Sequence, residues 1–146
     1  MFRKITDSLY VSPQISVADV AQAQALGITM IVNNRPEGEE PGQPTGDEIE
    51  AAAQAAGMDY VAVPVTHAGF APWQLDQMGG ALDQASDGPN SGKVLAYCRS
   101  GTRCTLLWAL TRARAGDDAD TLSALAAEAG YDLSPIRQIM DAVNGG

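Results

Sequence analysis

The sequence contains little cysteine, histidine or positive charge and no long apolar run, and each shortage excludes a class of protein. Its two cysteines, six positions apart, are too few for the disulfide framework of a small secreted domain. Nine Lys and Arg against 18 Asp and Glu give a net charge of −9, so neither a nucleic-acid nor a membrane partner is expected. The stretch MFRKITDSLYVS lacks the apolar core of a signal peptide, and no segment is long enough for a transmembrane helix. A cytoplasmic location with reduced thiols is therefore expected.

The remaining composition is typical of one globular domain. Apolar residues make up 45% of the chain and charged residues 18%, and 146 residues are enough to bury one sizeable core. No internal repeat or linker divides the chain, so a single domain over residues 1–146 is expected. The single histidine and the absence of a His, Cys and Asp cluster with metal-ligand spacing predict no metal and no other cofactor.

Apolar runs that predict strands alternate along the chain with helical patterns. A continuous β-branched run such as ITMIV is typical of a strand covered on both faces. Strands are expected at 9–13, 28–32, 60–65 and 93–97, and helices at 16–26, 45–56, 72–85, 103–114, 118–129 and 134–143. Residues 33–44, which include the acidic EGEE, are expected to form a solvated surface loop. The alternation predicts an α/β fold, a three-layer sandwich whose central sheet is mostly parallel and has residues 93–97 as a central strand.

The segment YCRSGTRC, residues 97–104, carries the densest chemistry. Cys98 directly follows a predicted buried strand, and a helix is predicted to begin near Arg103. Free backbone N–H groups at a helix N-terminus point at one place, where the helix dipole adds partial positive charge. Gly101 allows the chain to curl without a Cβ penalty, so that successive amides can form a concave anion site. We therefore expect residues 98–103 to wrap around a single point.

Cys98 is the predicted nucleophile of this loop. The amides, the dipole and a nearby arginine all favour the thiolate, so its pKa should be lowered. Arg103 can present a planar fork of donors to an oxyanion. The loop residues expected to bind the anion are Arg99, Ser100, Gly101 and Thr102. The pattern favours covalent catalysis on an anionic group, and the alternative is that Cys98 is a small buried core residue.

These segments resemble the cysteine-dependent phosphatases of the dual-specificity type. LYVSPQIS, LGITMIVNNRP, YVAVPV and KVLAYCRSGTRCTLLWAL occur in that family's order and spacing. More closely, the chain is similar to the bacterial phosphatase-like domain that is also fused to beta-lactamase-hydrolase-like proteins. The resemblance covers roughly residues 3–140 and rests on VNNRPEGEEPGQP, VPVTHAGF and YCRSGTRC. It implies the cysteine-phosphatase fold, and members of this group are named phosphatases or sulfur transferases.

Two departures from the dual-specificity pattern bear on the reaction. Four residues separate Cys98 from Arg103, one fewer than in those phosphatases, and this is the spacing of rhodanese-like sulfur transferases. His67, or Thr66 if the alignment shifts by one position, stands where dual-specificity phosphatases carry the Asp that protonates the leaving oxygen, and His67 is therefore a candidate catalytic residue. An unperturbed imidazole is an acid only below a pKa of about 6.5. Both departures favour sulfur transfer over phosphoester hydrolysis.

Four further residues carry weaker signals. Arg35 follows a strand end that should share an edge with Cys98, so it is a candidate for substrate binding or for a salt bridge to a neighbouring glutamate. Cys104 is a candidate for contact with the thiolate or for a resolving thiol, and otherwise a first-turn helix residue that faces the core. Trp73 and Trp108 lie on predicted helices and are interpreted as core or rim residues.

Three functions remain open from the sequence. The first is a sulfur transferase that accepts sulfane sulfur on Cys98 and passes it to a small thiol acceptor. The second is a phosphatase acting through a phosphocysteine. The third is a module that binds an anion without turnover, favoured by the lack of a carboxylic acid in VPVTHAGF. All three require a small anionic partner, either a sulfane-sulfur donor or a phosphoester.

Overall fold

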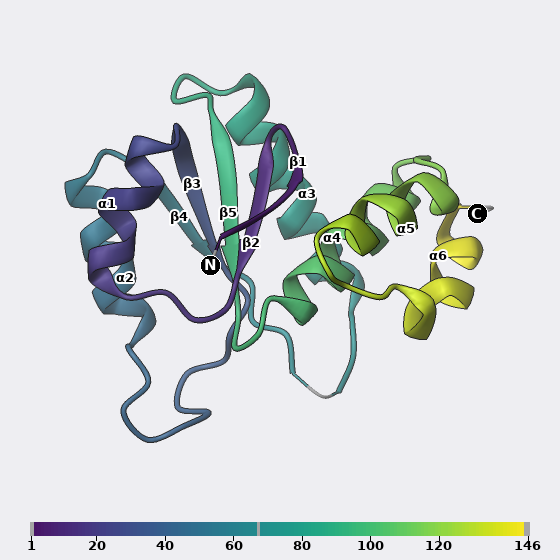
Figure 1. Cartoon of the computed structure of the whole chain (residues 1–146), viewed down its shortest axis with the longest axis horizontal. Coiled ribbons are helices and arrows are strands. Elements are labelled where there is room, and N and C mark those ends of the chain that lie inside the picture. The colour runs from purple at the N-terminus through teal and green to yellow at the C-terminus, as the bar shows by residue number, and fades with distance from the viewer. Residues whose placement is uncertain (1, 67, 145–146) are drawn as a thin grey trace.

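The computed structural model describes residues 2–66 and 68–144, which form a five-stranded sheet flanked by helices (Figure 1). The strand order is β1-β2-β5-β3-β4, in which β1 is antiparallel to β2 and all other neighbours are parallel. The strands are β1 (Arg3–Thr6), β2 (Leu9–Ser12), β3 (Ile28–Asn33), β4 (Asp59–Ala62) and β5 (Lys93–Tyr97). The helices are α1 (Val17–Ala25), α2 (Gly46–Ala55), α3 (Pro72–Asp87), α4 (Thr102–Arg114), α5 (Ala119–Glu128), the 3-10 turn Ser134–Ile136 and α6 (Arg137–Asn144).

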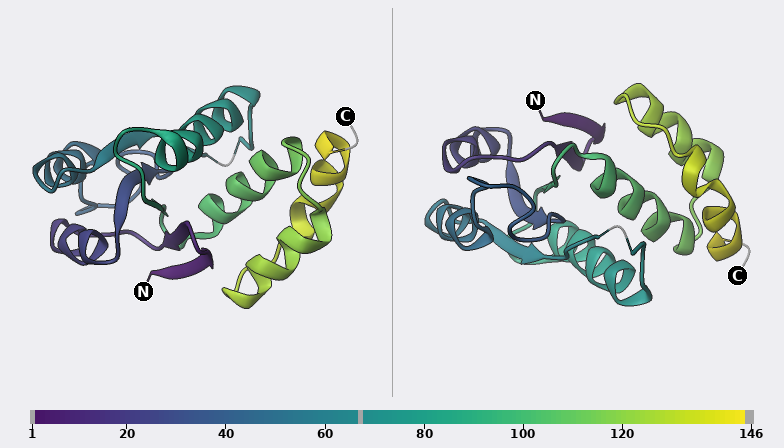
Figure 2. Two further views of the ribbon diagram at one scale, coloured as in Figure 1. Left: turned by 90° about the horizontal axis from the view of Figure 1, so that it is seen from above. Right: turned by 90° about the horizontal axis from the view of Figure 1, so that it is seen from below.

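Helices cover both faces of the sheet. Figure 2 shows α1 and α2 on one face and α3 and α4 on the other, with α5 and α6 packed outside α4. The central strand β5 divides its side chains between the two layers, because successive strand residues point to opposite faces. Leu95 and Tyr97 join the core under α1 and α2, whereas Val94 and Ala96 join the larger core under α3 and α4. All four are buried, as the continuous apolar run predicts.

The predicted fold class is confirmed, and most element boundaries agree within two residues. Residues 93–97 are the central strand, as expected. The prediction for 60–65 is wrong at its end, because β4 stops at Ala62 and the chain turns away toward α3. Strand β1 was not predicted, because its Arg3 and Lys4 are exposed and hide the alternation typical of a strand. The last predicted helix, 134–143, begins as a 3-10 turn before α6.

Parallel strands bring their carboxyl ends to one edge of the sheet, and this places the loops of interest together. The chain segments after β2, β3, β4 and β5 all leave the edge at the bottom of Figure 1. At this edge Gln14 N–H donates to the Arg99 carbonyl (3.4 Å) and Asn34 N–H to the Tyr97 carbonyl (2.8 Å). The expectation of a surface loop over 33–44 is wrong for residues 33–35, which are buried, and Asn33 is the last residue of β3.

Among the described residues, no helix combines the length and the apolar character that crossing a membrane requires.

Candidate active site

The loop between β5 and α4 curls around the Cys98 sulfur. The Gly101 N–H donates to Cys98 Sγ at 3.1 Å, and Cys98 N–H donates to the Ser12 carbonyl at 3.3 Å. Helix α4 begins at Thr102, immediately after the loop, so its N-terminal dipole also faces the sulfur. The backbone thus converges on the sulfur in the way that an anion cradle requires.

Gly101 is the residue that permits this curl. Its φ is +88°, in the left-handed region that glycine adopts without a Cβ penalty. A Cβ at this position would also collide with the hydroxyl of Tyr131, which follows α5. That hydroxyl donates to the Ser100 carbonyl at 3.2 Å. Tyr131 therefore holds the outer side of the loop in place. The two residues are 31 positions apart, so no local sequence pattern predicts this contact.

The pKa of Cys98 is lowered from about 9 to about 5. The largest cause is a hydrogen bond from the Cys104 thiol, and backbone N–H groups of Cys104, Ser100 and Gly101 add to it. These donors outweigh burial, which by itself would raise the pKa. Burial and the adjacent thiolate instead raise the pKa of Cys104 well above its ordinary value. At neutral pH the pair is therefore a thiolate at Cys98 and a thiol at Cys104.

Arg103 is held by three hydrogen bonds that leave one edge of its guanidinium free. Nη1 donates to Glu39 Oε2 (2.9 Å) and to the Val65 carbonyl (2.7 Å), and Nη2 donates to Glu39 Oε1 (2.8 Å). A guanidinium has five N–H donors, so Nε–H and the second Nη2–H remain. No residue in the described part of the chain accepts from them. These two donors lie on the same edge and form the fork that suits a tetrahedral oxyanion.

Glu39 is a residue of this site that the sequence analysis did not single out. Its carboxylate bonds both Arg103 and Arg35, and these contacts lower its pKa to about 2, with the Arg103 bond as the largest cause. Its side chain is only 21% exposed, so the interpretation of EGEE as a solvated loop is wrong at this position. One feature of the sequence could have indicated Glu39. The acidic residues follow a strand whose carboxyl end lies on the same sheet edge as Cys98.

Arg35 and Arg99 tie the acidic loop to the cradle. The buried Arg35 donates to Glu39 (3.0 Å), Glu40 (2.8 Å) and Gln14 (3.0 Å). Arg99 forms an ion pair with Glu40 at 2.9 Å. Of the two roles considered for Arg35, the structure shows the salt bridge to neighbouring glutamates. Arg35 is connected to Arg103 through Glu39, which bonds both.

Cys98 is buried at the base of the loop, whereas several of its loop neighbours are exposed. Cys98 has no exposed surface, although Arg99, Ser100 and Thr102 beside it are exposed. The Ser100 and Thr102 hydroxyls bond each other at 3.0 Å on the outer side of the loop.

The loop after β4 flanks the cradle through the Val65 carbonyl, which accepts from Arg103. His67, the candidate acid, lies outside the described residues. The sequence from Val63 to Ala71 contains no Asp or Glu. Among the described residues, no three His, Cys, Asp or Glu side chains are grouped closely enough to hold a metal ion.

A buried thiolate in a strand–loop–helix cradle beside an oriented arginine, on a mostly parallel sheet, defines a cysteine-phosphatase-like domain. Residues 1–115 match the family model described as beta-lactamase hydrolase-like protein, phosphatase-like domain, and the chain belongs to this family. A beta-lactamase hydrolase-like protein of Agrobacterium fabrum is 35% identical over 113 residues, which are 77% of this chain and 25% of the relative. The chain thus spans about a quarter of the length of the curated relatives it matches.

Solved structures agree with this assignment. A protein from Neisseria meningitidis Z2491, provisionally described as a phosphatase, is 35% identical, with a TM-score of 0.79 and coverage of 97% of this chain and 96% of that chain. The active form of Tk-PTP has a TM-score of 0.73 over 99% of this chain and 96% of its own, at 15% identity. The second likeness concerns the fold alone.

Proposed function

We propose that the domain is a phosphatase that cleaves a phosphate monoester through a phosphocysteine at Cys98. The observation that carries this proposal is the thiolate beneath converging amides, with the free edge of Arg103 beside it. Membership of the phosphatase-like family and the phosphatase-like solved relatives support it. The sequence analysis placed sulfur transfer first, and the comparisons favour the reverse order.

Two chemical steps follow from this assignment. The Cys98 thiolate attacks phosphorus, an S–P bond forms, and the ester P–O bond breaks with its electron pair on the leaving oxygen. Water then attacks the phosphocysteine, phosphate departs, and the thiolate is regenerated. The loop amides and Arg103 would bind the equatorial oxygens, whose charge must be stabilised in both transition states.

The leaving oxygen sets the range of substrates. A strongly basic alkoxide needs a proton as it departs, whereas a phenolate needs less assistance. Because Val63 to Ala71 contains no carboxylic acid, we expect aryl phosphates to be cleaved faster than alkyl phosphates. His67 is the only titratable side chain in that segment and is the candidate donor.

Glu39 is a positioning residue in this scheme. Its two oxygens occupy the end of the Arg103 guanidinium and turn the Nε/Nη2 edge away from the acidic loop. The carboxylate also raises the pKa of Arg103, so the guanidinium stays charged.

A second candidate is sulfane-sulfur transfer. The four-residue spacing between Cys98 and Arg103 and the buried Cys104 thiol beside the nucleophile favour it. In this reaction the thiolate attacks the outer sulfur of thiosulfate, an S–S bond forms, and sulfite leaves with the electron pair. A small thiol then removes the sulfur from the Cys98 persulfide. The departing sulfite needs little protonation, so the missing carboxylic acid matters less.

A side-by-side assay distinguishes the two reactions. Hydrolysis of p-nitrophenyl phosphate and thiosulfate-to-cyanide transfer are measured on one preparation, with Cys98→Ser as the control. Mass spectrometry of acid-quenched protein then identifies phosphate or one added sulfur on Cys98. Hydrolysis with a trapped phosphocysteine supports the phosphatase, and sulfur transfer with a persulfide replaces it by the second candidate. No turnover of either substrate and no covalent adduct would refute both and leave an anion-binding module.

A further inference from the structure

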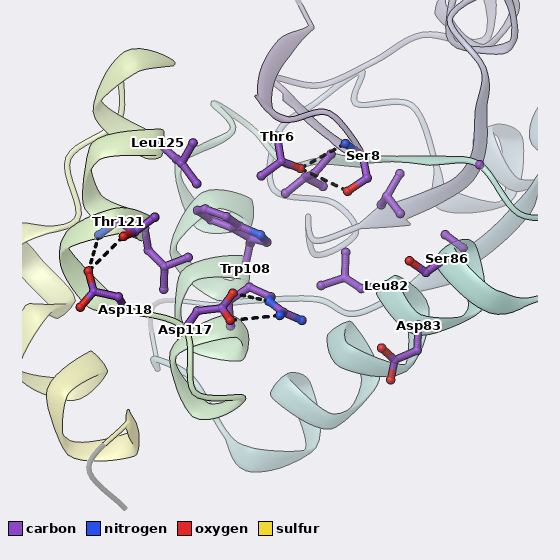
Figure 3. A pocket seen from close by; sticks show the side chains of 16 residues that line it. Thr6, Ser8, Leu82, Asp83, Ser86, Trp108, Asp117, Asp118, Thr121 and Leu125 are labelled. Atoms are coloured by element: carbon purple, nitrogen blue, oxygen red, sulfur yellow. Dashed lines mark hydrogen bonds and ion pairs between the residues drawn. The ribbon is translucent and has the colours of Figure 1, made fainter.

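A cavity of about 510 Å³ lies at the end of the sheet opposite to Cys98. It is bordered by the β1–β2 turn, α3, the start of β5, α4 and α5 (Figure 3). Gly92 and Val94 mark the amino-terminal end of β5 in its wall, whereas Cys98 follows the carboxyl end of the same strand. The volume is within the range of small-molecule sites, about 300–1,000 Å³. The catalytic cradle does not share this cavity.

Trp108 of α4 gives the cavity an unpaired donor. Its side chain is almost fully buried, at 3% exposure, yet no residue in the described ranges 2–66 and 68–144 accepts a hydrogen bond from its indole N–H. Figure 3 shows the nitrogen side of the ring turned toward the space bordered by Leu82 and Ser8. The nitrogen is not one of the sealed, unpaired side-chain atoms of the described residues, so it is open to the cavity, where a ligand acceptor can pair it.

The charged groups of the wall leave one carboxylate without a direct partner, although this carboxylate, Asp83, is close enough to Arg112 to raise the pKa of that guanidinium. Asp117 holds Arg112 through two bonds of 2.8 and 3.2 Å. Asp118 caps α5 by accepting from the Thr121 N–H and hydroxyl, both at 3.0 Å. The described residues provide no hydrogen bond or ion pair to the Asp83 carboxylate, which lies at the rim. Three carboxylates against one guanidinium make the wall anionic and favour a cation.

Apolar side chains complete the lining. Leu82, Leu122 and Leu125 surround the Trp108 ring and offer a surface for an apolar ligand body. Because the indole is only 3% exposed, an apolar ligand body would lie against these leucine side chains, beside the edge of the indole that carries the N–H. The three features together specify an apolar body, an acceptor and a positive charge.

We propose that this cavity binds a small aromatic amine: its ring lies against the leucine side chains of the lining, an oxygen accepts from the Trp108 indole N–H, and its ammonium group pairs with Asp83. The site is independent of the proposed phosphatase activity, since it shares no residue with the cradle. Tyramine has these three features. Tyrosol has the same ring and phenol but a neutral hydroxyl in place of the ammonium, and it serves as the matched probe.

The indole resonances of the ¹⁵N-labelled full chain report binding directly. The sequence has two tryptophans, and Trp73→Phe assigns the Trp108 signal in the spectrum. Tyramine should shift the Trp108 signal saturably and leave the signal of Trp73, which is 46% exposed, in place. Tyrosol should bind about fivefold more weakly, because one surface ion pair contributes roughly a factor of five.

Two variants in α3 test the charge assignment. Asp83→Asn should raise the half-saturation concentration of tyramine about fivefold and leave that of tyrosol unchanged. Asp87→Asn, on the same helix and outside the cavity lining, should change neither. An unsaturable Trp108 shift, equal affinity for the two probes, or equal effects of the two variants would each overturn the proposal. None of these readouts depends on catalysis.

Discussion

The amino-terminal end and the middle of α4 use hydrogen-bond donors in different ways. At its amino-terminal end the donors are oriented: Gly101 N–H donates to Cys98, and the Arg103 guanidinium is fixed on Glu39 and the Val65 carbonyl with one edge left free. Further along the helix, Trp108 keeps its N–H free beside an open cavity. Stabilising charge that develops during a reaction requires dipoles oriented beforehand. Binding a ready-made ligand instead requires donors and acceptors that are still available.

The buried core shows why the reactive end can be so rigid. Cys98 and Cys104 are both part of the cluster under α3 and α4, and neither has exposed surface. Side chains in a close-packed interior keep their rotamers, so the two sulfur atoms stay in fixed relation. The same burial would be costly for a thiolate without donors, and the cradle supplies them.

Removing the sulfur nucleophile should have the largest effect on the reactive end. Cys98→Ser replaces a thiolate by a hydroxyl that stays protonated, so phosphate-ester turnover should fall by at least about 10³-fold. The covalent adduct should also vanish from the mass spectrum. A circular dichroism spectrum like that of the wild type would show that the loss is chemical. Retained turnover would assign the reaction to another group.

Arg103→Lys tests the free guanidinium edge. An ammonium keeps the charge but cannot form two parallel hydrogen bonds to an oxyanion. We expect kcat/KM to fall about 30- to 1000-fold, equivalent to roughly 2–4 kcal/mol of transition-state stabilisation. Arg114→Lys is the matched control, since Arg114 lies on the same helix and pairs with Asp76 at the surface. Equal activities of the two variants would make Arg103 a structural residue.

Glu39→Gln tests whether the acidic loop positions that edge. The amide keeps the size of the side chain but replaces one of the two acceptors for Arg103 by a donor, and it removes the charge. We expect kcat to fall about 10- to 100-fold, less than for the arginine variant because Arg103 remains present. Stability should fall by about 1–3 kcal/mol, since a partly buried charge-assisted pair is lost.

The comparison for Glu39 is Glu40→Gln in the same loop. Glu40 is 46% exposed and contacts Arg35 and Arg99 but not Arg103. Its loss should change kcat less than threefold and stability by about 0–1 kcal/mol, as for surface pairs. If both variants lose activity equally, the loop acts as a whole and Glu39 has no special role.

How far the sequence predicted these features depends on the range of the interaction. The α/β class, the central strand and the curl at Gly101 follow from local patterns, namely an apolar run, a glycine and a helix start. The partners of the cradle come from far along the chain: Glu39 lies 64 positions from Arg103, and Tyr131 lies 31 positions from Ser100. Local periodicity contains no information about such contacts. Acidic residues in a loop are ordinarily predicted to be exposed to solvent, so the sequence did not indicate that Glu39 contacts Arg103.

The smallest expected change, and the one that isolates the thiol pair, is in the titration of Cys98. The ultraviolet absorbance of its thiolate should appear with a midpoint near pH 5, the pKa that the surrounding donors set. Cys104→Ala removes the donor that lowers the pKa most, so the midpoint should rise. Cys104→Ser keeps an O–H donor, so its midpoint should rise less.

The lowered pKa of Cys98 also makes the stability of the fold depend on pH. Because the folded pKa lies below the ordinary value of about 9, the thiolate stabilises the fold fully above that pH, and this contribution disappears as pH falls toward 5. As the pH falls from about 9 to about 5, the free energy of unfolding of the wild type should therefore decrease relative to that of Cys98→Ser. The decrease should be smaller when both proteins also carry Cys104→Ala. A midpoint unaffected by Cys104→Ala would mean that the backbone N–H groups alone hold the thiolate.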